Sequence, residues 1–343
     1  MTPFDNEKYK ELQAKAIYER VSRFDKLYLE VGGKLFDDNH AARVLPGFDP
    51  SVKMQILKTL SSNIEIIFCI NANDIIAGKV RDDNNLTYGE EIFRLAELMK
   101  KDGLSVCAIN ITFYSSHPKV KDFEEKCKTL GFSCYHSYTI RNYPNDVDLI
   151  LSENGYGKND YILTHKKLIL VCAPGANSGK MQTALSQLYN DKMHGIVSGY
   201  AKYETFPVWN LPLEHLTNLA YEMATADLLD KNMIDPFHKK EYGIEAVNYN
   251  RDIESFPILS KILNQITGRE IYKSPTDMGI NQVGFGIVDD KAVQIAGFAE
   301  IERRYNKYKN KYDSVKDKLI LENSEKIYKN AKILLEKLTK NHG

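Results

Sequence analysis

The first 200 residues alternate between apolar runs and amphipathic segments. Several of the apolar runs are continuous and β-branched, as expected of strands that are covered on both faces of a parallel sheet. The strand candidates are residues 26–31, 64–70, 104–112, 132–139, 146–152 and 167–173. Helical patterns at 88–103 and 119–131 each end in Gly after a lysine-bearing last turn, which is a helix stop signal. The repetition predicts the α/β fold class, with a mostly parallel, three-layer sheet domain.

The pattern changes after about residue 200. Residues 213–231 and 251–268 have helical periodicity, and almost everything from residue 291 onward is helical and rich in charge. One short strand is expected near 282–290, within "QVGFGIVDD". A chain of 343 residues exceeds the size at which one core usually stops growing. We therefore expect an α/β domain over 1–200 and a mainly helical domain over 201–343.

Charge and composition narrow the function classes. The 46 basic and 46 acidic side chains balance, so the sequence predicts no electrostatic capture of nucleic acid or of an anionic membrane. No apolar run approaches the roughly 18–20 residues of a membrane span, and the N-terminus lacks a signal peptide pattern. The five cysteines include no CxxC pair, which is typical of a reducing compartment. A cytoplasmic location is expected.

One stretch, "KLILVCAPGANSGKM", has the parts of a phosphate-binding loop. An apolar strand leads into a turn with Gly175 and Gly179, and Lys180 begins a helix whose N-terminus favours anions. Ser178 and Thr183 are the nearby hydroxyls for a Mg²⁺ ion. The strict Walker pattern requires Gly at 174 and Ser or Thr at 181, and the chain has neither. The alternative is an ordinary glycine-containing turn between a strand and a helix.

Further polar loops follow the predicted strands at 32–50, 70–85 and 152–161. Loops at the carboxyl ends of parallel strands gather at one edge of the sheet, so these segments are expected to converge on the Gly-Lys turn. They contribute the candidate anion contacts Arg43, Arg81 and Lys158, and a later turn contributes Arg251. The alternative is that these segments are plain solvent-exposed connections. In "SGYAKYETFPVWNLPLEH" (198–215), Lys202 and Glu204 are candidates to face a cleft.

Carboxylates that could act as an acid, a base or a Mg²⁺ ligand are few. Glu153 follows the predicted strand 146–152, and Asp235 and Asp277 lie in polar turns of the C-terminal half. "GFGIVDD" resembles a Walker B strand ending in a carboxylate pair, although acidic residues at such places more often cap helices. The acidic residues around His238 match no tight metal-binding spacing, and no metal site is assigned.

Eight short motifs, quoted at the end of this paragraph, occur in an order that resembles a known protein family. The chain resembles uncharacterised protein family 0371 (domain of unknown function 1846), a bacterial family without an established activity, from about Phe24 to Arg304. The resemblance implies an α/β domain followed by a helical domain, and members usually continue beyond the length of this chain, so it looks like a shortened member or a fragment. Family members often have Pro and Gly where Ala176 and Asn177 stand here. Because Asn tolerates left-handed backbone, we expect the turn to keep its shape. The motifs are "RVLPGF", "INANDI", "ENGYGKNDYI", "APGANSGKM", "KYETFPVWNLPL", "NMIDPFH", "VNYNRD" and "SPTDMGIN".

These observations favour a cytoplasmic enzyme that binds a phosphorylated small molecule, with a nucleotide and Mg²⁺ as one form of that ligand, between the two domains. Phosphoryl or nucleotidyl transfer or hydrolysis is the reaction class. Two alternatives stay open: a non-catalytic metabolite-binding or assembly protein, and an enzyme on a sugar or carboxylate substrate that uses no nucleotide. Self-association into a homo-oligomer also stays open.

Overall fold

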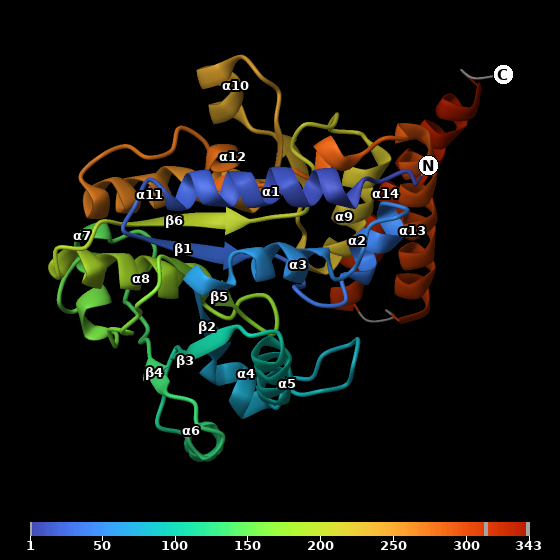
Figure 1. The fold of residues 1–343 in the computed structure, drawn as a ribbon. Helices are drawn as coiled ribbons and strands as arrows, with labels where there is room; N and C mark the ends of the chain where they lie inside the picture. The colour runs from blue at the N-terminus through green and yellow to red at the C-terminus, as the bar shows by residue number, and fades with distance from the viewer. Residues whose placement is uncertain (1, 312–314, 341–343) are drawn as a thin grey trace.

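The computed structural model describes residues 2–311 and 315–340. Its centre is a seven-stranded sheet in the order β4-β3-β2-β5-β1-β6-β9, in which every neighbouring pair is parallel (Figure 1). The strands are β1 (Lys26–Val31), β2 (Ile64–Asn71), β3 (Ser105–Thr112), β4 (Cys134–His136), β5 (Leu168–Cys172), β6 (Ser198–Tyr203) and β9 (Gly279–Ile280). A separate antiparallel pair is made by β7 (Asn232–Ile234) and β8 (Val247–Tyr249).

Helices cover both faces of the large sheet. On one face, alternate side chains of the strands, such as Leu29 and Phe68, form a core with α1 (Asn6–Val21), α3 (Val52–Thr59), α5 (Tyr88–Lys101) and α6 (Pro118–Thr129). On the other face, the intervening side chains, such as Tyr28 and Cys69, pack against α7 (Val147–Ile150), α8 (Lys180–Met193) and α11 (Asn250–Thr267). The three-layer α/β architecture expected from the sequence is confirmed.

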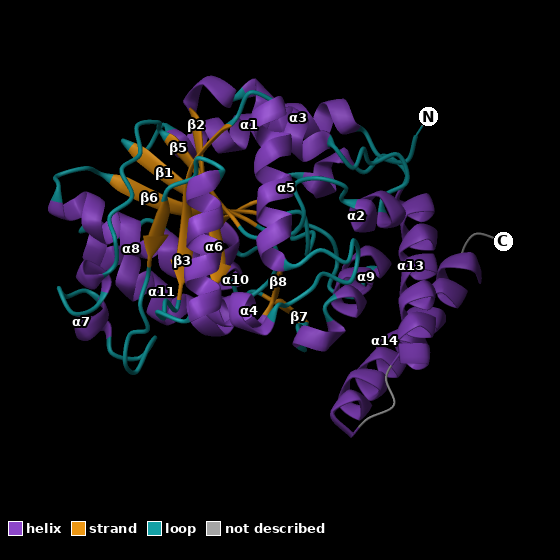
Figure 2. Ribbon diagram, turned by 90° about the horizontal axis from the view of Figure 1, so that it is seen from below, coloured by secondary structure: helices purple, strands orange, loops and turns teal. Residues whose placement is uncertain are grey.

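The remaining helices gather mainly beyond the carboxyl edge of the sheet. α13 packs against α9, α2 and α14, and both ribbon views show α13 and α14 side by side at one end of the molecule (Figures 1 and 2). These helices are α2 (Asn39–Val44), α4 (Ala72–Ala77), α9 (Leu216–Ala224), α10 (Pro236–Tyr242), α12 (Pro275–Met278), α13 (Asp290–Lys311) and α14 (Val315–Lys340). Short 3₁₀ turns are η1 (Ser61–Asn63), η2 (Tyr156–Lys158), η3 (Ala226–Leu228) and η4 (Val283–Gly286). The C-terminal part is mainly helical, as expected.

Local signals explain several element boundaries. Thr87 caps α5 and exchanges reciprocal hydrogen bonds with Glu90, which forms a capping box at the helix start. β2 is buried over its first seven residues, and this accounts for its unbroken apolar run. The strands expected at 26–31, 64–70, 104–112 and 167–173 are confirmed, and the one expected at 132–139 shortens to β4.

Two predicted strands are wrong. Residues 146–152 contain the short helix α7, because the Asp146 carboxylate accepts the backbone N–H of Leu149 and starts a helical turn. Residues 282–290 contain the turn η4 and the start of α13 instead of a strand. Here Gly286 packs under the ring of Phe4, and Ile287 bridges to Phe4. The strand of this region is the two-residue β9, a few positions earlier.

The sequence analysis does not predict strand β6, which carries residues of the candidate site. β6 begins at Ser198 and pairs with β1 along its whole length, although its sequence "SGYAKY" is not apolar. The predicted domain boundary at residue 200 falls inside β6. The large sheet also includes β9, which lies beyond that boundary in the sequence. The division of the chain into domains at that residue stays a prediction. Within residues 2–311 and 315–340, no helix has both the length and the apolar character that crossing a bilayer demands.

Candidate functional site at the carboxyl edge of the sheet

The chain changes direction across the sheet between β1 and β5. After β1 the chain passes through α3 on one face to reach β2, whereas after β5 it passes through α8 on the other face to reach β6. Adjacent parallel strands whose connections leave toward opposite faces open a crevice at their carboxyl ends, and open α/β sheets bind ligands there. The carboxyl ends of β5, β1 and β6 are therefore where a ligand site is expected.

The Gly-Lys turn occupies this position. Residues 173–179 connect the end of β5 to the first residue of α8, Lys180. Asn177 has a φ of 58° and Gly179 a φ of 81°, so both adopt the left-handed backbone that Asn tolerates better than other non-glycine residues. Inside the turn, Ser178 Oγ donates to the carbonyl of Gly175 over 2.9 Å.

Neighbouring elements hold the turn in place. Thr112 at the end of β3 donates its hydroxyl to the carbonyl of Ser178 over 2.9 Å, and the Arg81 guanidinium donates to the carbonyl of Pro174. A Cβ atom at Gly179 would lie 2.7 Å from Thr112 Cγ2, so the close approach and the positive φ together require glycine. The turn is a fixed part of the sheet edge.

The start of α8 has no side-chain cap from any of the described residues, and its N-cap is Gly179. The first backbone N–H groups of a helix have no partner inside the helix, and with the helix dipole they favour negative charge. Lys180 Nζ lies 3.7 Å from Glu30 Oε1 of β1, and both side chains are about five-sixths buried. The lysine is thus held beside Glu30 near the carboxyl ends of β5 and β1.

A cluster of buried charges continues from Glu30 along β6. Tyr200 donates its hydroxyl to Glu30 Oε2 over 2.6 Å. Lys202 is the register partner of Glu30 in the β1–β6 pair and forms an ion pair with Asp252 in the first turn of α11. Glu204 follows β6 directly and is only 8% exposed. We call Glu30, Lys180, Lys202, Glu204 and Asp252 the edge cluster.

The edge cluster contains a carboxyl group that titrates near neutrality. Burial and the nearby Asp252 carboxylate raise the pKa of Glu204 from 4.5 to about 7. Burial opposes the charge of Lys202, but Asp252, Glu204 and Glu30 outweigh it and raise its pKa to about 12. The cluster thus combines a permanently charged ammonium group with a carboxyl group that can give or take a proton at pH 7.

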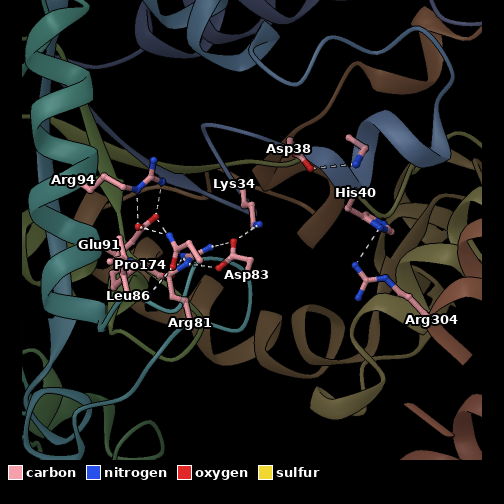
Figure 3. A network of polar contacts seen from close by, with 12 residues as sticks. Lys34, Asp38, His40, Arg81, Asp83, Leu86, Glu91, Arg94, Pro174 and Arg304 are labelled. Atoms are coloured by element: carbon pink, nitrogen blue, oxygen red, sulfur yellow. Dashed lines mark hydrogen bonds and ion pairs between the residues drawn. The ribbon is translucent and has the colours of Figure 1, made fainter. Parts of the chain in front are cut away.

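Arg81 lies at the Gly-Lys turn, as the sequence predicts. It forms a fork with Asp83, with 2.9 Å from Nε to Oδ1 and 2.8 Å from Nη2 to Oδ2, and Lys34 from the loop after β1 also reaches Asp83. Figure 3 shows Arg81 directed to Pro174 and Asp83, with Lys34 approaching from the other side. The loops after β1 and β2 are therefore linked to the Gly-Lys turn.

The other predicted cationic residues lie at different distances from the turn. Lys158 stacks over the ring of Tyr138, whose carbonyl accepts a hydrogen bond from Gln182 in the first turn of α8. Arg251 forms an ion pair with Asp230 and stacks over Tyr249, beside the edge cluster. Arg43 belongs elsewhere, because its Nε donates to Glu300 of α13 over 2.7 Å.

Thr183 lies beneath the turn and is fully buried. Its hydroxyl donates to the carbonyl of Gly179 and accepts from Asn110 of β3 over 2.8 Å. The hydroxyl therefore ties α8 to the sheet. The buried Ser178 hydroxyl is likewise engaged inside the turn.

The three predicted carboxylates do not meet at this edge. Asp235 is fully buried and caps α10, accepting from the backbone N–H groups of Phe237 and His238 and from the hydroxyl of Thr276. Asp277 accepts from Tyr242 and from the backbone of Lys273. Glu153 is exposed in the turn after α7, so its expected place at the end of a strand is wrong.

The suggested Walker B carboxylates also have capping roles. Asp289 accepts the backbone N–H of Ala292, and Asp290 contacts His215 Nε2 at 2.9 Å at the start of α13. The residues around His238 do not gather either: within residues 2–311 and 315–340, no group of three His, Cys, Asp or Glu side chains is placed to hold a metal ion.

Sequence reasoning missed two of the five residues of the edge cluster, Glu30 and Asp252. Lys202 and Glu204 were expected to face a cleft, but Glu30, Asp252 and Tyr249 were not singled out. A usable signal existed for Glu30, since a carboxylate inside a strand that is buried on both faces has to be paired. Asp252 carries no such signal, because its place depends on how α11 docks on β6.

Comparison with known proteins places the chain in a family. Residues 2–338 match the family described as "Domain of unknown function DUF1846, N-terminal". A UPF0371 protein of Clostridium botulinum (strain Alaska E43 / Type E3) is 49% identical over 341 residues, which are 97% of this chain and 68% of that protein. UPF0371 proteins of Fusobacterium nucleatum and Clostridioides difficile (strain 630) are 52% and 50% identical over 305 residues, 89% of this chain and 60% and 61% of theirs.

The chain thus spans 60–68% of the length of these three relatives. The resemblance drawn from the ordered motifs is confirmed. The chain belongs to the UPF0371 family and carries its DUF1846 domain.

Proposed function

We propose that this protein is a cytoplasmic enzyme that binds a phosphorylated small molecule at the carboxyl edge of the sheet. The observation that carries the proposal is the position of Lys180: it opens an uncapped helix at the point where the connections of β1 and β5 diverge. All five cysteines are free thiols, which suits a reducing compartment. Phosphoryl or nucleotidyl transfer or hydrolysis is the proposed reaction class.

The anion site consists of the Gly-Lys turn and the first turn of α8. The backbone N–H groups and the Lys180 ammonium supply positive charge, and the buried position strengthens their attraction for a phosphate. Arg81 is held to the carbonyl of Pro174 and supports the shape of the turn. Gly175, Ser178 and Gly179 supply the backbone that closes around the phosphate.

The proposed ligand does not depend on a Walker-type Mg²⁺ site. Met181 stands where the magnesium-binding hydroxyl of a Walker loop would be, and the Thr183 hydroxyl already donates to Gly179. A nucleotide with Mg²⁺ is one ligand to test beside inorganic phosphate and sugar phosphates.

Isothermal titration calorimetry with inorganic phosphate, glucose 6-phosphate and ATP, with and without Mg²⁺, tests the proposal. Lys180→Ala should weaken binding of a phosphate ligand at least about tenfold, because a charge-assisted hydrogen bond contributes about 1.5–3 kcal/mol. The melting temperature should fall modestly, because the substitution removes the cation beside the buried Glu30 carboxylate, which keeps its hydrogen bond from Tyr200. Lys192→Ala is the matched control, since Lys192 lies in the last turn of the same helix.

Equal affinity of Lys180→Ala and the wild type for every phosphate ligand would overturn the proposal. Binding that depends on Lys180 but leads to no chemical turnover with any of the ligands would favour the non-catalytic metabolite-binding alternative.

A further inference from the structure

A cavity of about 390 Å³ lies near the amino ends of β1 and β6, at the opposite edge of the large sheet from the Gly-Lys turn. One wall is the segment between α1 and β1, and the other is residues 269–272, which follow α11. Figure 1 shows α1 and α11 ending on the side of the sheet where β1 and β6 begin. The volume is within the range of about 300–1,000 Å³ that is usual for small-molecule sites. We call this space the arginine cavity.

Three arginines line the arginine cavity, and no carboxylate of the described residues forms an ion pair with any of them. Arg20 donates to the hydroxyl of Tyr272 over 3.0 Å and to the carbonyl of Asp277 over 2.8 Å. Arg269 donates to the carbonyl of Arg23 over 3.4 Å. All of these acceptors are neutral. The positive charges of the three guanidinium groups are therefore left for a ligand to balance.

One carboxylate also lies on the wall of the cavity. Glu270 Oε2 lies 2.6 Å from Lys273 Nζ, and this ammonium group offsets the charge of the glutamate. Three arginines against one paired glutamate leave the wall with an excess of positive charge. An anion in the cavity would meet attraction from several sides, and partial enclosure strengthens that attraction relative to open water.

Two aromatic rings support the arginines from beneath. The guanidinium carbon of Arg20 lies 5.0 Å from the centre of the Tyr272 ring, and that of Arg269 lies 5.7 Å from the centre of the Phe24 ring. Tyr272 and Phe24 are both buried, and the Tyr272 hydroxyl donates to the carbonyl of Tyr200 in β6. The rings thus fix two guanidinium groups on the sheet, and a ring of a ligand finds little aromatic surface to stack on.

The third guanidinium group acts on the same place. Arg23 lines the cavity, and its charge, together with that of Arg20, opposes the rise in the pKa of Tyr272 that burial causes. Cations from two separate segments therefore converge on one space. They repel each other there, and an anion placed between them removes that repulsion.

We infer that the arginine cavity binds a compact small-molecule polyanion that carries at least two phosphate or carboxylate groups. Guanidinium groups recognise the oxygen atoms of both groups through paired N–H donors. At least two anionic groups are needed because Arg20 and Arg23 come from one segment and Arg269 from the other. This site is separate from the phosphate site at Lys180 and does not depend on it.

Isothermal titration calorimetry with sodium pyrophosphate and with citrate at pH 7.5 tests the inference. The titrations use the full chain and its Lys180→Ala variant, in which the Gly-Lys turn is weakened and binding to the arginine cavity should remain. Arg23→Ala and Arg269→Ala should each weaken binding at least about fivefold, which corresponds to about 1 kcal/mol, the upper value for exposed ion pairs. Both side chains are exposed, so the variants should keep the melting temperature of the wild type nearly unchanged.

Arg141→Ala is the matched control, because Arg141 is exposed and lies outside the cavity wall. Its affinity for both probes should equal that of the wild type. Binding of pyrophosphate alone would identify the ligand as a phosphate compound, and binding of citrate alone would identify it as a carboxylate; either result supports the inference when binding depends on Arg23 and Arg269.

Unchanged affinity in both arginine variants, or the absence of binding by either probe, would overturn the inference. The outcome is distinguishable from a failure of the proposed function. Pyrophosphate binding that is lost in Lys180→Ala and kept in Arg23→Ala and Arg269→Ala leaves the phosphate site standing and removes the arginine cavity. Binding that is kept in Lys180→Ala and lost in the arginine variants has the opposite meaning.

Discussion

Two buried glutamates, Glu300 and Glu204, differ in how far hydrogen bonds and ion pairs replace the hydration that each carboxyl group has lost. Glu300 of α13 is fully buried and accepts from Arg43, Arg303 and Arg304, and His40 Nδ1 lies 3.2 Å from its Oε1. Glu204 at the sheet edge is also buried, but it accepts one hydrogen bond from Tyr249 and faces Asp252. Both carboxyl groups have lost water, and only one has received full compensation.

The pKa values of the two glutamates differ in the direction that this compensation predicts. Burial opposes ionisation of Glu300, but the hydrogen bonds from Arg303, His40 and Arg43 hold its pKa well below the usual range. Burial and Asp252 raise the pKa of Glu204 to about 7. A carboxylate surrounded by guanidinium groups is suited to joining two parts of a fold, here α2 and α13. A carboxyl group that is left under-compensated is suited to chemistry.

The largest loss of stability is expected from Glu300→Ala. Removing the carboxylate leaves three guanidinium groups close together without their partner, and losing one member of a buried ion pair costs about 3–5 kcal/mol. The unfolding free energy from chemical denaturation should fall by about 3 kcal/mol, the lower value, because Arg43 and Arg303 are 40% and 46% exposed. Glu302→Ala on the exposed side of α13 is the control. A loss below about 1 kcal/mol would contradict the structural role of Glu300.

Glu204→Gln should stabilise the protein, but only toward alkaline pH. The folded pKa of about 7 exceeds the ordinary 4.5, so the folded state holds the proton more tightly than the unfolded state. Stability from this group is complete below pH 4.5 and is lost as the pH rises through 7. Each pKa unit corresponds to about 1.4 kcal/mol, so the variant should gain about 3 kcal/mol over the wild type at pH 8 and almost nothing at pH 4.5.

The measurement is the difference in unfolding free energy between Glu204→Gln and the wild type across this pH range. A constant difference would show that Glu204 titrates as an ordinary carboxyl group, and the contrast with Glu300 would disappear. Glu153→Gln, which changes an exposed carboxyl group, provides the baseline.

The smallest effect is expected from Tyr249→Phe. Its hydroxyl stabilises the Glu204 carboxylate, so its loss should raise the pKa of Glu204 further and move the midpoint of the pH-dependent stability to higher pH. The change in unfolding free energy should stay near 1 kcal/mol, the usual net contribution of one hydrogen bond. A midpoint that moves to lower pH would show that the hydroxyl does not support the carboxylate.

The fold was largely predictable from the sequence, because long apolar runs determine which strands are buried on both faces. β1, β2, β3 and β5 follow this rule. The rule failed for β6, whose "SGYAKY" alternates small, aromatic and charged residues, because Lys202 is paired across space with Asp252. It also failed at 146–152, where one capping aspartate turned an apolar run into a helix.

The site was predictable only where its chemistry is local in sequence. The Gly-Lys turn is one continuous segment, and its left-handed Asn177 was anticipated. The edge cluster comes from residues 30, 180, 202, 204 and 252, which meet only through the strand order and the docking of α11. Charged residues inside strands are the signal that a sequence reading should weigh more heavily.

The parallel register that sets Glu30 beside Lys202 limits where the chain can change its length. Side chains of a strand alternate between its two faces, so one residue gained or lost before Lys202 would turn the ammonium group into the apolar layer under α1 and would place a tyrosine or an alanine in the crevice. Length variation should therefore be confined to the loops, and a relative that differs in length inside β6 should lack the edge cluster altogether.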